Sequence, residues 1–195
     1  MILSPYYKTD QVHRDSLKNF QCESLMVIFR EVFADGYATR LIKGGSEPEY
    51  IPATKKGGEH HIIFTHDYFS SALHEVAHWC VAGEQRRLQH DYGYWYAPDG
   101  RDEKQQAEFE QVEVKPQAVE WLFSRACGIP FRISVDNLAA GMAASEGFKA
   151  AIVQQVHDYC LGEVNDRAKS FIAALTHYYK TSSVFDVHYY AADKL

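Results

Sequence analysis

Apolar residues recur every three or four positions along much of this chain, which is the spacing of helices that bury one face. The pattern predicts helices over 23–33, 67–83, 104–123, 148–161 and 167–179. Two short apolar runs beside glycine pairs, 39–43 and 61–65, predict strands. Because helices outnumber strands and no repeat or clear linker is visible, we expect one compact α+β domain with a small sheet.

Four stretches interrupt or extend this pattern. Residues 1–19 are polar and mixed, and they predict an N-terminal extension to a single domain over 20–195. Pro116 predicts either a kink in the third helix or a restart between two helices. Residues 131–138 predict a further strand or an extended link, and 48–56 predict irregular structure.

Composition narrows the class of protein without indicating a reaction. The 195 residues are 46% hydrophobic and 24% charged and carry a net charge of −6, which is ordinary for a globular domain and gives no sign of direct nucleic-acid binding. Residues 1–10 contain no apolar signal region, and no apolar run reaches the length of a membrane span. The four cysteines are far apart, which excludes a CxxC motif. We expect a cytoplasmic protein without disulfides or a membrane span.

The second predicted helix contains an H-E-x-x-H motif, His74-Glu75-Val76-Ala77-His78. Residues four apart share one face of a helix, so both imidazoles can face one metal ion. Asp67 is a suitable N-cap for this helix, and Gly83 stands where the helix is expected to end. An apolar stripe beside the histidines would place them at the edge of the core; it consists of Leu73, Val76, Ala77 and Cys80.

Two histidines alone hold a divalent metal weakly, so we expect a third protein ligand. The candidates are acids of the third predicted helix, Glu108, Glu110, Glu113 and Glu120. Glu113 and Glu120 lie near the apolar stripe of that helix, where an acid is costly unless it is paired or bound to a metal. Glu110 points away from the centre of the stripe. We expect Glu113 to be the ligand, with Glu120 as the second choice.

This set of two nitrogens and one carboxylate suits either of two metals. Zn²⁺ would support hydrolysis, with Glu75 as the general base that takes a proton from the attacking water. Fe(II) would support oxygen chemistry, and Glu75 would then hold an outer hydrogen bond or orient a substrate amine. Gln117 is expected to support a ligand without binding the metal, and His66, just before the helix, is either a similar partner or a loop histidine.

A cluster of aromatic residues precedes a Pro-Asp-Gly turn and is a candidate substrate contact. Its residues Tyr94, Trp95 and Tyr96 predict either a cover for the core or a rim that grips a long cationic side chain. The charged residues Asp99, Arg101 and Asp102 are expected to meet charged groups of a substrate, although Asp99-Gly100 also suits the turn itself.

Four segments resemble the bacterial elongation factor P hydroxylases, and the likeness extends from Ser24 to Tyr179. They are TRLIKG at 39–44, SALHEVAHWC at 71–80, YGYWYAPDGRD at 92–102 and FEQVEVKPQA at 109–118. The resemblance implies a non-haem iron monooxygenase that uses O₂ to hydroxylate the β-lysylated lysine of the translation factor EF-P. It also implies a zincin-like metal site held by His74, His78 and Glu113. A zinc metallopeptidase and a non-catalytic, metal-stabilised adaptor are the alternatives that the motif itself leaves open.

Overall fold

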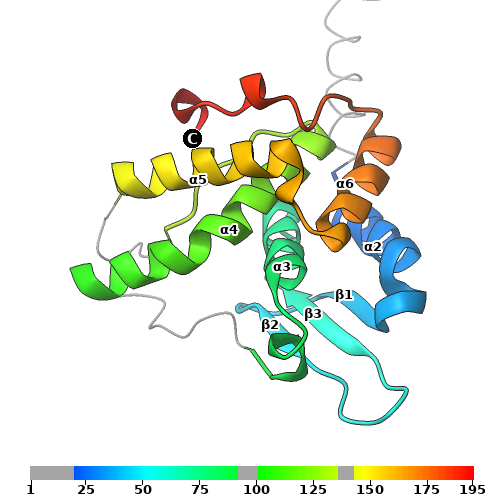
Figure 1. Ribbon diagram of the computed structural model, residues 1–195. Coiled ribbons are helices and arrows are strands. Elements are labelled where there is room, and N and C mark those ends of the chain that lie inside the picture. Colours follow the sequence, from blue (N-terminus) through cyan, green and yellow to red (C-terminus); the bar gives the residue numbers. More distant parts are fainter. Residues whose placement is uncertain (1–19, 92–100, 136–142) are drawn as a thin grey trace, which may run out of the picture.

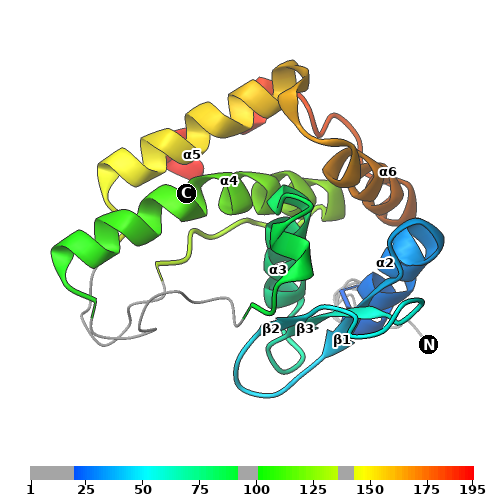
Figure 2. The same cartoon turned by 60° about the horizontal axis from the view of Figure 1, so that its bottom comes forward.

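The computed structural model describes residues 20–91, 101–135 and 143–195. Five α-helices make up most of this described part: α2 (Cys22–Tyr37), α3 (Phe69–Val81), α4 (Glu103–Cys127), α5 (Glu146–Asp158) and α6 (Asp166–Tyr179). Figures 1 and 2 show α3 standing between the sheet and α4, with α5 alongside α4 and α6 beside α2. The prediction of one compact, helix-rich α+β domain is confirmed.

The small sheet supports the N-terminal end of α3. Its strands are β1 (Thr39–Lys43), β2 (Glu49–Ile51) and β3 (His60–Phe64), and β3 lies between a parallel β1 and an antiparallel β2. The stretch predicted to be irregular therefore contains β2, and that prediction is wrong for 49–51. Gly44 ends β1 by donating its N–H to the Phe64 carbonyl at 2.9 Å, and a Cβ there would collide with the Ile63 side chain. Glycine thus permits this close approach of the two strands.

Buried aromatic rings connect the helices. Phe29 and Phe33 of α2 pack on Trp79 of α3, with ring centroids 5.3 and 4.8 Å apart. Phe171 of α6 packs on Phe29 and on Phe123 of α4, at 5.9 and 5.1 Å. The apolar stripe predicted for α3 is buried in the same core; it comprises Leu73, Val76, Ala77 and Cys80. Because this stripe is fixed against the core, the rotation of α3 and the direction of its histidine face are fixed too.

The long helix α4 runs without interruption through Pro116, so the alternative of two separate helices is wrong. Asp102 caps its start: the carboxylate accepts the Gln105 N–H at 2.8 Å, and the Gln105 side-chain oxygen accepts the Asp102 N–H at 3.0 Å. Gly128, with φ of 77°, ends it in the left-handed conformation that glycine adopts without strain. One rigid helix therefore carries every acid proposed as the third ligand.

The structure decides two further local predictions, and the first of them is wrong. Asp67 does not cap α3, because its carboxylate pairs with Lys43 of β1 at 2.6 Å and Tyr68 takes the N-cap position without a side-chain bond. Of the two alternatives predicted for 131–138, residues 131–135 form the link and not a strand, and the rest of that segment, like the extension over 1–19, lies outside the described residues.

Candidate metal centre

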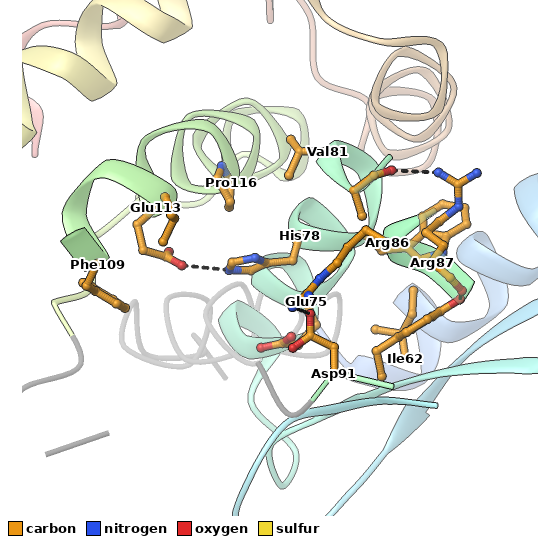
Figure 3. Close-up of a pocket in the computed structure, with 14 residues that line it drawn as sticks. Ile62, Glu75, His78, Val81, Arg86, Arg87, Asp91, Phe109, Glu113 and Pro116 are labelled. Atoms are coloured by element: carbon orange, nitrogen blue, oxygen red, sulfur yellow. Dashed lines mark hydrogen bonds and ion pairs between the residues drawn. The ribbon is translucent and has the colours of Figure 1, made fainter. Parts of the chain in front are cut away.

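The two histidines of the H-E-x-x-H motif lie on the face of α3 that is turned toward α4. Their ring centroids are 4.6 Å apart, and their Nε2 atoms are 3.0 Å apart. Glu113 of α4 faces both rings: its carboxylate oxygens lie 3.1 Å from His78 Nε2, a contact that Figure 3 draws, and 3.7 Å from His74 Nε2. One donor atom from each of the three residues lies within 4.8 Å of the others. The structure therefore brings together the three residues expected to bind a metal.

The electrostatics of this cluster suit a cation. Burial raises the pKa of the Glu113 carboxyl, but the facing imidazoles of His78 and His74 outweigh burial and lower that pKa to about 2. Burial lowers the pKa of His74, while the carboxylates of Glu120 and Glu113 outweigh it and raise that pKa well above its usual value. Glu113 is thus held as a carboxylate. Where no metal ion balances its negative charge, the imidazoles take up protons. A divalent ion would replace those protons.

Glu120, the second choice as ligand, lies behind His74 rather than beside Glu113. Its carboxylate contacts His74 Nδ1 at 2.7 Å, and the side chain is buried. With Nδ1 donating to this carboxylate, the electron pair of Nε2 would be directed to a metal ion held beside Glu113. Histidine ligands of metals are commonly oriented by a carboxylate in this way. The structure therefore gives Glu120 the position of an orienting residue.

Gln117 lies behind Glu113, as the sequence predicted. Its Nε2 donates to a Glu113 oxygen at 3.2 Å and to the Ser134 carbonyl at 2.7 Å. Its side-chain oxygen accepts the Ser134 N–H at 3.1 Å. The amide is fully buried and all three contacts are mutually consistent. Gln117 therefore holds the segment after α4 against that helix. It also limits the rotamers of Glu113.

Glu75 lines a cavity of about 460 Å³ between α3, the sheet and α4, together with His78 and Glu113. No hydrogen bond or ion pair joins its carboxylate to another residue of the described part of the chain. Burial raises the pKa of this carboxyl, and the nearby imidazoles of His74 and His78 act in the opposite direction. An acid at a cavity with no direct partner is available to a substrate or to a proton.

The other predicted site residues lie away from this cluster or outside the description. His66 lies in the turn before α3, where its ring packs on Tyr68, and the structure does not bring it to the three central residues. Arg101 is buried, donates to Gln106 and the Val135 carbonyl, and lies over the Phe109 ring, while Asp102 is the N-cap of α4. Their contact with a substrate stays a prediction. Tyr94, Trp95, Tyr96 and Asp99 lie outside the described residues.

The far side of the cavity contains polar residues that sequence reasoning missed. They are Tyr50, Arg86, Arg87 and Asp91. Residues 84–90 are strongly polar and have no periodic pattern, which is equally typical of a surface loop. Their position at the cavity becomes visible only in the structure, where a backbone bridge between Tyr50 and Asp91 holds this loop against β2.

The fold and the cluster together define a helix-rich α+β protein with two histidines and a glutamate gathered beside a cavity that His78 and Glu113 line. The profile of the elongation factor P hydroxylase family matches residues 28–189. The chain is also 45% identical over 159 residues to a protein of Haemophilus influenzae named elongation factor P lysine hydroxylase, covering 82% of this chain and 89% of that protein. The chain therefore belongs to the elongation factor P hydroxylase family. Within residues 20–91, 101–135 and 143–195, every helix is too short or too polar to span a bilayer.

Proposed function

We propose that this chain is a metal-dependent monooxygenase that hydroxylates the β-lysylated lysine of elongation factor P. Family membership supports the reaction and the protein substrate. The observation that carries the chemistry is the meeting of His74, His78 and Glu113 in one cluster, of which His78 and Glu113 line the cavity. Two imidazoles and one carboxylate that leave further coordination positions open are the donor set of non-haem Fe(II) oxygenases.

The residues of the chain have separate tasks in this proposal. His74, His78 and Glu113 would hold Fe(II), or zinc in purified protein. When bound, Fe(II) would supply the activation of O₂ that insertion of one oxygen atom into a C–H bond requires, while two electrons from an external reductant and two protons would convert the other oxygen atom to water. Glu120 orients the His74 ring through Nδ1, and Gln117 limits the movement of Glu113. Both contacts would keep the donor atoms converged while substrate enters and leaves.

Glu75 is proposed as the catalytic residue that orients the substrate amine, because its carboxylate faces the cavity without a direct partner in the described part of the chain. Tyr94, Trp95, Tyr96 and Asp99 are proposed to form the entry for the lysine side chain. Because elongation factor P is a translation factor, we propose that the enzyme works in the cytoplasm and contacts neither membrane nor nucleic acid directly.

The test is the mass of the protein substrate. β-Lysylated elongation factor P incubated with the enzyme, Fe(II), O₂ and an external two-electron reductant should gain one oxygen atom in intact-mass analysis. Glu113→Gln should abolish the gain and lower the metal content of the purified enzyme, because it removes an anionic ligand. Glu108→Gln is the matched control, since Glu108 lies on the exposed side of the same helix, 3.9 Å from Lys104. A wild-type enzyme that retains metal and leaves the substrate mass unchanged would contradict the proposal.

The zinc metallopeptidase remains the second candidate because of one observation: burial raises the pKa of Glu75 next to the histidine pair, as a general base requires. This alternative predicts peptide cleavage that Glu75→Gln abolishes while zinc is retained. If the zinc-loaded wild-type enzyme cleaves no member of a peptide library, the peptidase function is excluded.

A further inference from the structure

The cavity has a second polar wall, and this wall carries more positive than negative charge. The guanidiniums of Arg86 and Arg87 stand there against a single carboxylate, that of Asp91. Arg86 forms an ion pair with Asp91, so these two charges balance each other. In Figure 3, Glu113 lies to the left of His78, whereas Arg87 lies to its right. Arg87 is therefore a charge of the cavity wall that Asp91 does not balance.

A third guanidinium, that of Arg167 at the start of α6, lies beside Arg87. Both arginines donate to the Ala82 carbonyl, at 2.7 Å from Arg87 and 2.6 Å from Arg167. Arg167 also donates to the Cys80 carbonyl at 2.8 Å. Burial lowers the pKa of Arg167, and the charge of Arg87 lowers it further. In the part of the chain that the structure describes, neither arginine forms an ion pair with a carboxylate, so two like charges share one neutral acceptor.

The carbonyl end of α3 balances only part of this charge. A helix C-terminus is equivalent to about half a negative charge, so two guanidiniums at one helix end leave a surplus of roughly one and a half positive charges. The Tyr37 ring lies 5.9 Å from Arg87 and 5.7 Å from Arg167, but an aromatic ring has no net charge. The Nε atom of Arg167 is buried and has no hydrogen-bond partner among the described residues. This end of the cavity therefore has donors and positive charge without a matching anion.

The arginine pair lies close to the candidate metal centre. Ala82, whose carbonyl both arginines bind, follows His78 by four residues, which corresponds to about 6 Å along the axis of α3. Ala82 and Arg87 line the same cavity of about 460 Å³ as His78 and Glu113, so a group bound in this cavity can reach Arg87. The lysine side chain of the proposed substrate is cationic and is repelled by a guanidinium. The surplus charge of this wall consequently suits a different, anionic group.

We propose that Arg87, supported by Arg167, binds a carboxylate at the end of the cavity remote from Glu113. A planar guanidinium presents two parallel N–H donors that match the two oxygens of a carboxylate. Arg87 supplies the direct contact from the cavity wall, and Arg167 adds its charge from the other donor to the Ala82 carbonyl. The carboxylate belongs either to an acidic side chain of the protein substrate or to a free organic acid. The site does not depend on the proposed reaction, because neither arginine is a candidate metal ligand.

The test is a calorimetric titration of the metal-loaded enzyme with succinate, at an ionic strength held constant with sodium chloride so that general screening does not change. The wild type should bind succinate. Arg87→Gln should weaken binding about tenfold, as expected for loss of a charged hydrogen bond, and Arg167→Gln should weaken it several-fold. Arg87→Lys keeps the charge without the planar fork and should fall between the wild type and Arg87→Gln. Arg125→Gln is the matched control: this guanidinium lies 3.7 Å from the centre of the Tyr189 ring near the end of α4 and does not line the cavity.

A wild type that does not bind succinate would overturn the proposal, and so would succinate binding that Arg87→Gln leaves unchanged while its metal content equals that of the wild type. If Arg87→Gln does not fold, Arg87→Lys and Arg167→Gln decide, and wild-type affinity in both counts against the site.

A second titration, with elongation factor P in the presence and absence of succinate, identifies the source of the carboxylate. Weaker binding of the protein in succinate assigns the site to one of its acidic side chains, and unchanged binding assigns the site to a free organic acid. Neither titration requires oxygen chemistry, so a failed hydroxylation assay leaves the carboxylate site standing. Absence of succinate binding in turn leaves the hydroxylase function untouched.

Discussion

At the scale of single residues, the candidate centre depends on three side chains that share one face of α4. Glu113, Gln117 and Glu120 follow one another at intervals of four and three residues, so all three project toward α3 or the link that packs beside it. Burying carboxylates is costly unless they are paired. Each of the two acids meets an imidazole of α3, at 3.1 Å for Glu113 and 2.7 Å for Glu120. The cost of burial is therefore offset only when both helices keep their relative position.

The contact between Glu120 and His74 yields a prediction that separates orientation from ligation. Glu120→Gln should weaken metal binding by roughly 10- to 100-fold, because the amide no longer favours the His74 tautomer whose Nε2 faces the site. At saturating metal the variant should still insert oxygen, since all three ligands remain. The measurement is a competition titration against a chromophoric chelator, followed by the mass assay with excess Fe(II).

Glu113→Gln is the comparison in the same titration. At the metal concentrations that saturate the wild type, this variant should neither bind the metal nor insert oxygen, because it lacks a ligand rather than a supporting contact. Equal metal affinity of Glu120→Gln and the wild type would show that the bond to Nδ1 does not orient His74.

At the scale of helices and strands, the parts that could be predicted are those with a local periodic signal. The apolar stripe of α3 places His74 and His78 on one face, and the stripe of α4 sets Glu113 and Glu120 apart from Glu110. The role of Glu120 could not be predicted, because it depends on which nitrogen of His74 it meets, and the packing of α3 on α4 decides that. The three-residue strand β2 was missed because its partner, β3, defines it.

The edge of the sheet at β2 and β3 provides a pH-dependent prediction. Burial lowers the pKa of His60 below its usual value, and the charge of Arg87 adds to this effect. His60 Nδ1 lies 3.2 Å from the Ala53 N–H, which donates to it, so protonation of Nδ1 would break that bond. The unfolded chain takes up the proton at a higher pH than the folded chain. The stability contributed by neutral His60 is thus present above its unfolded pKa and is lost as the pH falls through the folded pKa.

We expect the contribution of His60 to the free energy of unfolding to decline from about pH 7 to about pH 5, while His74 and His78, whose pKa values are raised, contribute in the opposite direction. His60→Asn should therefore lose less stability, or gain more, than the wild type as the pH falls, because the asparagine oxygen can accept the same N–H without titrating. Urea unfolding at a series of pH values measures both slopes. An NMR titration of the His60 ring that gives a pKa at or above the ordinary histidine value would refute the assignment.

At the scale of the whole molecule, α3 and α4 join two groups of elements. α3 packs on β3 and α2, while α4 packs on α5 and α6 (Figure 2). The candidate ligands lie on both sides of the contact between α3 and α4. A metal ion there would therefore cross-link the half of the core that contains the sheet to the half that contains the C-terminal helices.

This position leads to a prediction about the stability of the entire fold. A ligand that binds only the native state stabilises it by about 2.7 kcal/mol when its free concentration is 100 times its dissociation constant. Divalent metal should therefore raise the melting temperature of the chelator-treated wild type and of Glu108→Gln, and removal of the metal should reverse the rise. His74→Ala and Glu113→Gln should melt at a temperature that does not depend on the metal, because neither can bridge the helices with three ligands. Thermal unfolding with and without metal makes the comparison, and a rise of wild-type size in Glu113→Gln would place the stabilising ion elsewhere.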